Sequence, residues 1–150
     1  MENAMSITHP QWPLTLFYDG ECPLCLREIR MFQRRNDSGH LHLLDIAAPT
    51  TEPLPGLSRQ DMLDCLHARF RDGRLVTGID ATYWSYRAVG LGWLVAPLRW
   101  AWARPLWQWG YRQFCRLRPT LARLIPMPDP DPDLPSQCES DRCRPRNRQD

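Results

Sequence analysis

The stretch 14–32 places a short apolar run, a sharp turn and a pair of cysteines directly after one another. The run LTLFY is suited to a buried strand. An Asp-Gly pair ends it, because glycine tolerates the backbone angles of a tight turn. Pro23 then favours the first position of a helix, where its missing N–H costs nothing. The stretch therefore predicts a strand over 14–18 followed by a helix over 23–35.

A Cys-x-x-Cys pair stands at the start of this predicted helix. At about 100° per residue, the pair shares one face with apolar side chains, and arginines occupy the opposite face. The first face holds Cys22, Cys25, Leu26, Ile29 and Phe32, and the second holds Arg27, Arg30 and Arg34. Unpaired N–H groups and the helix dipole would stabilise a thiolate at the first cysteine.

Thiol–disulfide exchange needs such a dithiol. Cys22 is the candidate attacking thiol, because the helix start lowers the pKa of a thiol. Cys25 is the candidate resolving thiol: it is close enough to attack the mixed disulfide, and we expect it to point further towards the core. Asp19 is a third candidate catalytic residue, which could accept or relay the proton of Cys25. Its alternative role is that of a turn or cap residue.

The motif Tyr18-Asp19-Gly20-x-Cys22-x-x-Cys25 resembles the signature of the DCC family of thiol–disulfide oxidoreductases, small proteins related to thioredoxin. The resemblance continues in DGR at 72–74, in TGIDA at 77–81 and in tryptophan-rich helices that end near 111–118. It implies an α/β, thioredoxin-like fold, with a small mixed sheet flanked by helices and with extra C-terminal helices. It also implies thiol–disulfide chemistry, with no defined substrate. We predict catalysis by the dithiol with no bound cofactor and no metal.

The remaining pattern agrees with this element order. A strand over 40–46 would run parallel to the first through the intervening helix. The strands predicted over 65–70 and 74–77 form a hairpin. The other predicted elements are a loop over 47–57, a short helix capped by Ser58 with Asp61 in place of the usual Glu, a helix over 79–89 capped by Asp80, and a last helix from Pro105 to about Leu117.

Composition divides the chain into three parts. We expect a flexible leader over 1–13, one domain over 14–122, and a disordered tail rich in Pro, Asp and Arg over 123–150. The first 16 residues lack the pattern of a signal peptide, so the expected location is the cytoplasm, where thiols stay reduced. All 19 basic residues are arginine, which excludes chemistry based on lysine.

The tail carries a second cysteine pair, which leaves an alternative open. Cys138 and Cys143 could join Cys22 and Cys25 in a zinc-stabilised interaction module without enzymatic activity. The tail pair could also be incidental. Cys65 and Cys115 fit apolar positions and are assigned no role. His67 resembles a position where the family often carries His, and a paired structural His is the alternative.

Five of the seven tryptophans lie between 93 and 109, with Arg99 and Arg104 among them. Arginines and prolines interrupt this segment, so it does not predict a transmembrane span. We expect these helices mainly to pack onto the sheet, while peripheral contact with a membrane or with a protein is the alternative. Trp109 is the exception, because it shares the polar face with Arg112 and Arg116, and an exposed Trp beside Arg could bind a partner. The partner expected at the dithiol is a protein or small-molecule disulfide or thiol, and a net charge of +2 does not favour nucleic acid.

Overall fold

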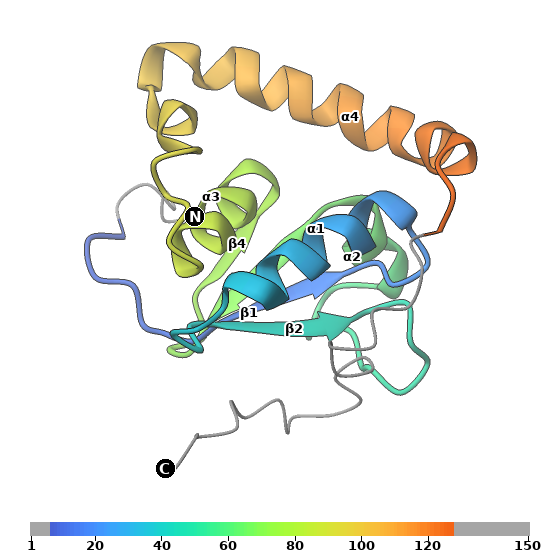
Figure 1. Cartoon of the computed structure of the whole chain (residues 1–150), viewed down its shortest axis with the longest axis horizontal. Helices are drawn as coiled ribbons and strands as arrows, with labels where there is room; N and C mark the ends of the chain where they lie inside the picture. The colour runs from blue at the N-terminus through green and yellow to red at the C-terminus, as the bar shows by residue number, and fades with distance from the viewer. Residues whose placement is uncertain (1–6, 128–150) are drawn as a thin grey trace.

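The computed structural model describes residues 7–127, which form a four-stranded mixed sheet flanked by helices (Figure 1). The strand order is β2-β1-β3-β4. The strands are β1 (Leu14–Tyr18), β2 (Leu41–Asp45), β3 (His67–Phe70) and β4 (Leu75–Thr77). The α-helices are α1 (Pro23–Arg35), α2 (Arg59–Asp64), α3 (Gly78–Ala88) and α4 (Arg104–Leu124), and two 3-10 turns, η2 (Ala96–Arg99) and η3 (Ala101–Ala103), precede α4.

Strand β1 lies inside the sheet and pairs with a neighbour on each side. It is parallel to β2, with Leu14 opposite Leu41, and antiparallel to β3, with Leu14 opposite Phe70. Strands β3 and β4 form the predicted antiparallel hairpin, whose turn contains Gly73 at φ 91°. The predicted thioredoxin-like α/β architecture is confirmed: a small mixed sheet is flanked by helices, and a further helix follows at the C-terminal end of the domain.

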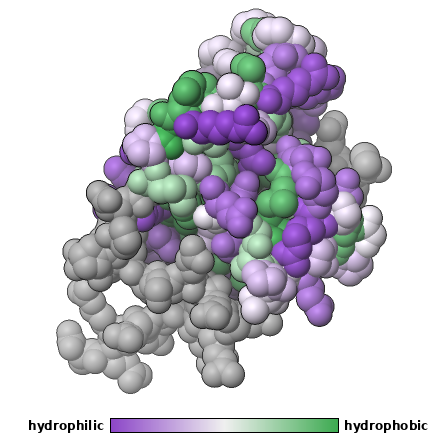
Figure 2. All heavy atoms as spheres, turned by 90° about the vertical axis from the view of Figure 1, so that its right-hand side faces the viewer, coloured by the Kyte–Doolittle hydropathy of each residue, from purple (hydrophilic) through white to green (hydrophobic). Residues whose placement is uncertain are grey.

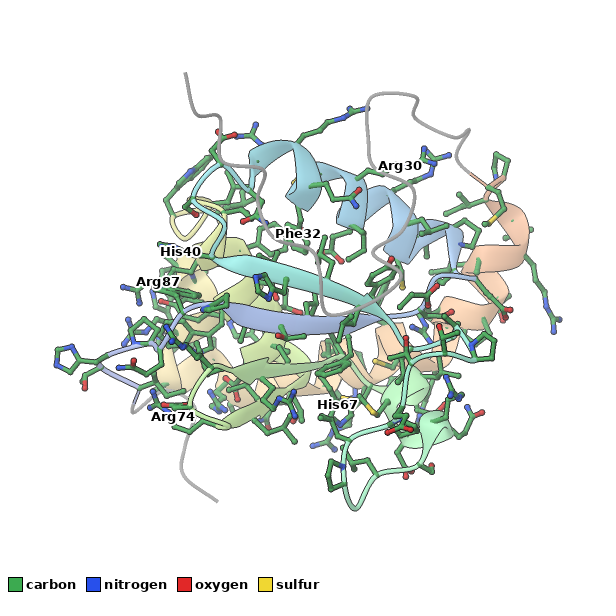
Figure 3. The ribbon with its side chains drawn as sticks, turned by 90° about the horizontal axis from the view of Figure 1, so that it is seen from below. Arg30, Phe32, His40, His67, Arg74 and Arg87 are labelled. Atoms are coloured by element: carbon green, nitrogen blue, oxygen red, sulfur yellow. The ribbon has the colours of Figure 1, made fainter. Side chains whose placement is uncertain are left out.

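The alternation of side chains along β1 divides the core between the two faces of the sheet. Leu14 and Leu16 point to the face covered by α1 and α3, where Phe32 of α1 packs against the strands (Figure 3). Phe17 points to the other face, where Met62 of α2 and the loop after β2 cover it. The two faces together hold β1 in place, and β1 ends at the turn that carries the cysteines.

The local signals at the two internal helices have different outcomes. Ser58 caps α2 in a full capping box with Asp61, as predicted. The predicted cap at Asp80 is wrong, because α3 begins at Gly78 with Thr77 as its N-cap residue. The Asp80 carboxylate instead forms an ion pair with Arg104 at 3.0 Å, which connects α3 to the start of α4.

Helix α4 continues to Leu124, seven residues beyond the predicted end near Leu117, and contains Pro119 in its interior. It runs along the side of the molecule that carries α1 and α3 (Figure 1). None of its residues is fully buried. The expected packing of the tryptophan segment onto the sheet is therefore wrong for Trp93, Trp100 and Trp102, which are exposed, whereas Trp109 is exposed as expected for its polar face.

The described part of the expected leader, 7–13, is packed against the domain and is not a loose segment. Trp12 stacks on His40 with ring centroids 5.1 Å apart and contacts Phe70 and Trp84. Ile7 also packs against the main core cluster. Between residues 7 and 127, no helix combines the length and the apolar character needed to cross a membrane.

Candidate active site

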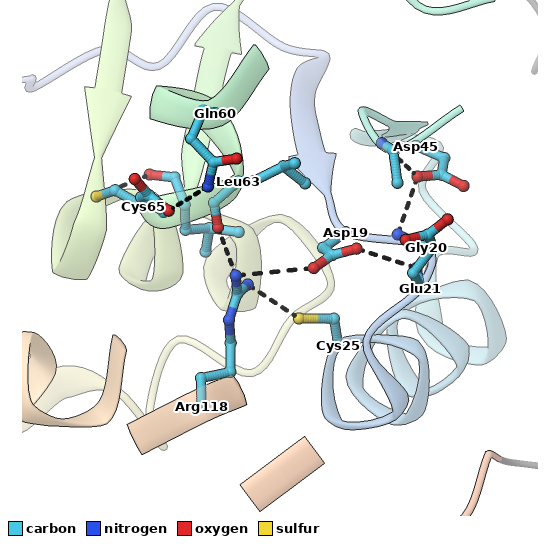
Figure 4. Close-up of polar contacts among 12 residues, drawn as sticks. Asp19, Gly20, Glu21, Cys25, Asp45, Gln60, Leu63, Cys65 and Arg118 are labelled. Carbon is cyan, nitrogen blue, oxygen red and sulfur yellow. Dashed lines mark hydrogen bonds and ion pairs between the residues drawn. The ribbon is translucent and has the colours of Figure 1, made fainter. Parts of the chain in front are cut away.

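A carboxylate from the neighbouring strand holds the turn between β1 and α1 (Figure 4). Asp45, the last residue of β2, accepts hydrogen bonds of 2.9 Å from the backbone N–H groups of Gly20 and Ala47. A Cβ atom at position 20 would lie 1.9 Å from Asp45 Oδ2, so only glycine fits at this position. The parallel pairing of Tyr18 with Asp45 brings the carboxylate to the turn.

The two cysteines of the motif lie at the start of α1, where the sequence predicts them. Cys22 is the N-cap residue, Pro23 begins the helix, and Cys25 follows in the first turn. Both are free thiols. The sequence predicted that Cys25 would point further towards the core. Cys22 is instead the less exposed residue, with 5% of its surface exposed, whereas Cys25 is half-buried. The turn encloses Cys22, whose N–H donates to the Asp19 carbonyl at 3.2 Å.

Arg118 of α4 reaches the dithiol from the far end of the chain (Figure 4). Its Nη1 lies 3.6 Å from the Cys25 sulfur, and its Nη2 lies 3.7 Å from Asp19 Oδ2. Nη2 also donates to the carbonyl of Leu63 in the last turn of α2. One guanidinium therefore connects the start of α1, the turn before it and the end of α2.

The two thiols have unequal pKa values. A hydrogen bond from the Cys25 thiol lowers the pKa of Cys22 to about 6, helped by the backbone N–H groups of Cys25 and Leu24 and the charge of Arg118, although burial opposes the change. The same hydrogen bond, followed by burial and by the charge of Cys22, raises the pKa of Cys25 above the ordinary cysteine range. Because the pair titrates together, the first proton leaves from Cys22.

Asp19 uses both carboxylate oxygens to support this site. Oδ1 accepts a hydrogen bond of 3.0 Å from the backbone N–H of Glu21, which is the turn role that the sequence left open. Oδ2 faces Arg118 in the ion pair described above. Arg118, and not Cys25, is thus the side-chain partner that the structure gives to Asp19.

The remaining candidate residues lie away from the dithiol. His67 is buried in β3, and its Nδ1 lies 2.6 Å from the carbonyl oxygen of Cys65, which is a structural contact (Figure 3). Cys65 lies 3.9 Å from the Tyr111 hydroxyl of α4, and Cys115 also lines the pocket beside it. Burial raises the pKa of Cys65, so this thiol is less nucleophilic than that of Cys22.

The zinc alternative depends on cysteines that the structure does not describe. Cys138 and Cys143 both lie outside residues 7–127. Within the described range, no group of three or more His, Cys, Asp or Glu side chains is arranged to hold a metal ion. The four-cysteine zinc site stays a prediction.

Sequence reasoning missed Arg118 and Asp45. Arg118 is 93 residues from Cys25 and is one of 19 arginines, so neither spacing nor residue type marks it. Ending the last helix near Leu117 also placed Arg118 outside that helix. A signal did exist for Asp45: a carboxylate at the end of the strand predicted to pair with β1, beside a turn glycine without a side chain.

A family model described as DCC1-like thiol-disulfide oxidoreductase matches residues 16–124. The chain belongs to this family. The matched range contains the dithiol, all of α4 and the sheet apart from the first two residues of β1. Arg118 of this DCC1-like domain is therefore inside the family region, together with Asp19 and Asp45.

An uncharacterized chloroplastic protein of Arabidopsis thaliana is similar to this DCC1-like chain, at 37% identity over 86 residues. The aligned region is 55% of this chain and 40% of the plant protein, so the chain spans less than half of the relative that it matches. No solved structure gives a significant match. Membership in the family supports thiol–disulfide chemistry, and the relative adds no substrate.

Proposed function

We propose that this protein exchanges disulfides through its dithiol, with Cys22 as the attacking thiol and Cys25 as the resolving thiol. The observation that carries the proposal is the unequal pair at the start of α1, in which the pKa of Cys22 is lowered to about 6. At pH 7 about 90% of such a thiol is thiolate, compared with a few per cent of an ordinary cysteine. The nucleophile is therefore available at neutral pH.

The exchange takes place in two displacements. In the first, the Cys22 thiolate attacks one sulfur of a substrate disulfide, forms a mixed disulfide and releases the other sulfur as a thiolate. In the second, Cys25 loses its proton and attacks the Cys22 sulfur, which releases the second substrate thiolate. The two substrate thiolates take up protons. The substrate disulfide is then reduced to two thiols, and the protein dithiol is oxidised to a disulfide.

Arg118 assists the second displacement. Cys25 must become a thiolate in order to attack, and its raised pKa opposes this step. The Arg118 guanidinium, 3.6 Å from the Cys25 sulfur, stabilises the negative charge as it forms. Asp19 is the counter-charge that keeps Arg118 in place. Acceptance of the Cys25 proton by Asp19 stays a separate prediction.

The proposed substrate is a protein or small-molecule disulfide or thiol. The pKa order also favours a direction of exchange. A stabilised Cys22 thiolate stabilises the reduced form of the protein, so the two displacements are favoured in reverse, with the protein disulfide oxidising a pair of substrate thiols. The proposed mechanism needs no bound cofactor. The cytoplasmic location stays a prediction.

The test follows the dithiol itself. The reduced protein is incubated with glutathione disulfide, quenched in acid and digested without reducing agent. We expect a peptide that contains a Cys22–Cys25 disulfide, and we expect the Cys22→Ser variant to lack it. Cys65→Ser is the matched control and keeps the disulfide. If Cys22 and Cys25 stay reduced while Cys65 or Cys115 of the same protein oxidises, the proposed function is wrong.

A further inference from the structure

The exposed large hydrophobic side chains of the described chain are concentrated in one segment. All of them except Leu75 lie between 93 and 127. They are Trp93, Leu94, Trp100, Trp102, Leu106, Trp109, Phe114, Leu117, Leu121, Leu124 and Met127. Trp102 exposes 78% of its surface and stacks on Trp100 with ring centroids 5.8 Å apart. Scattered single exposures are normal, but a continuous apolar surface indicates an interaction site.

On α4 these side chains form an exposed stripe along one side of the helix. At about 100° per residue, six of them fall within an arc of about 140°. They are Leu106, Trp109, Phe114, Leu117, Leu121 and Leu124. The inward side carries Trp107, Tyr111 and Arg118, which bond to Pro97, Leu66 and Leu63 of the domain. The contacts of this inward side fix the orientation of α4 and leave the stripe beside them, where its six side chains are exposed.

The charge of the same segment is entirely positive. Between residues 81 and 127 the sequence contains no Asp and no Glu, and it contains seven arginines. Arg112, Arg116 and Arg123 follow one flank of the apolar stripe and are exposed. In the upper part of Figure 2, at the level of α4 in Figure 1, hydrophobic side chains lie directly beside hydrophilic ones. Apolar and cationic groups are therefore presented side by side.

We infer that the surface formed by α4 and residues 93–103 docks on a bilayer that contains anionic lipids. An amphipathic helix of this kind lies in the plane of the interface, with its apolar stripe among the acyl chains and its arginines at the phosphates. Tryptophan prefers the same depth because its ring is apolar and its N–H is polar. Arginine in place of lysine adds bidentate contact with phosphate.

Two alternatives fit less well: a second copy of the chain on this surface, and α4 as a transmembrane helix. A second copy of the chain would bring two sets of arginines together, and the segment has no carboxylate with which to neutralise them. A crossing helix is excluded for α4, because Arg112, Arg116 and Arg118 lie in its middle. A flat anionic surface satisfies both the apolar stripe and the positive charge of the exposed Arg112, Arg116 and Arg123.

The test is flotation of the full chain with vesicles. Phosphatidylcholine vesicles, with and without phosphatidylserine, are compared at low and high salt. We expect binding to the vesicles that contain phosphatidylserine, with a blue shift of tryptophan fluorescence, and weaker binding in high salt. Each neutralised arginine should weaken the affinity about fivefold, so Arg112→Gln with Arg116→Gln should cost about 25-fold. Arg71→Gln is the control for exposed charge and should change the affinity less than twofold.

The apolar contribution has its own matched pair. Leu117→Gln removes an exposed leucine of the stripe, and Leu75→Gln removes an exposed leucine of β4. We expect only Leu117→Gln to lower vesicle binding and the fluorescence shift. The inference is overturned if the full chain binds neither vesicle, or if Leu117→Gln and Leu75→Gln behave alike. Concentration-dependent dimerisation that Leu117→Gln abolishes, without vesicle binding, would assign the surface to a second copy instead.

Discussion

The guanidinium of Arg118 lies 3.6 Å from the sulfur of Cys25, although the two residues are 93 positions apart in the chain. The long helix α4 makes this contact possible, because it brings its inward face past the start of α1. The dithiol is thus a site built by two parts of the chain. The thiols and the turn come from the N-terminal strand and helix, and the positive charge comes from the C-terminal helix.

Replacing Arg118 should affect the second displacement most strongly. Arg118→Gln removes a charge-assisted hydrogen bond of about 1.5–3 kcal/mol, so we expect the resolving step to slow by about ten- to a hundredfold. The pKa of Cys22 should also rise, since the charge of Arg118 helps to lower it. Stopped-flow measurement of mixed-disulfide decay gives the rate. Arg116→Gln, two residues away and exposed, is the control and should leave the rate unchanged.

The reactivity of Cys22 should follow its lowered pKa. A thiol reacts as the thiolate, so iodoacetamide labelling of Cys22 should be slow at pH 5, half-maximal near pH 6 and constant above about pH 7. The raised pKa of Cys25 predicts little labelling over the same range. Peptide mapping separates the two sites. Preferential labelling of Cys25 at pH 7 would contradict the assigned roles.

Local signals were sufficient for the first half of the fold. The bounds predicted for the first strand and the first helix are those observed, because an Asp-Gly turn and a Cys-Pro helix start act within a few residues. The hairpin and the Ser58 cap were predictable for the same reason. Each of these features depends on neighbours in sequence, and the hydrophobic alternation of β1 determines which of its residues face the core.

The errors come from tertiary contacts. Pro119 is a helix stop by local rules, but α4 continues through it. Asp80 is of a residue type that often caps helices, but its carboxylate forms an ion pair with the Arg104 guanidinium. The tryptophan-rich helices were expected to pack onto the sheet, but Trp93, Trp100 and Trp102 are exposed. A sequence does not say which face of a helix meets the core. Arg118 was missed because its contact with the dithiol depends on which face of α4 meets the domain.

The turn glycine should be essential for stability. Gly20→Ala places a methyl group against the Asp45 carboxylate and should lower the free energy of unfolding by about 2 kcal/mol. Gly110 of α4 is the matched control, because no atom lies within 4 Å of its added Cβ. Gly110→Ala should be neutral or should stabilise the protein by up to about 1 kcal/mol. Urea unfolding of the two variants measures the difference. Equal effects would contradict the close approach of Asp45.

Removal of residues 128–150 separates the redox and zinc interpretations. The cut is placed after Met127, because α4 itself ends only at Leu124. The removed sequence is rich in Pro and Asp and offers few apolar groups to bury, so we expect the thermal midpoint to change little. The zinc module would lose Cys138 and Cys143, and with them its metal and its stability. Metal analysis of protein purified without chelator, together with melting curves, checks both outcomes.

The final prediction concerns the inequality of the two cysteines. Cys25→Ser should trap a mixed disulfide with substrate, whereas Cys22→Ser should form none. The Cys22 thiolate still attacks in the first variant, but the thiol that would displace the substrate is missing, so the covalent complex persists until an external thiol arrives. Serine is close to cysteine in size, and the start of α1 should survive either change. Non-reducing gels of the two variants from cells should show discrete adducts for Cys25→Ser alone. If both variants form adducts, or if neither does, Cys22 is not the dedicated nucleophile.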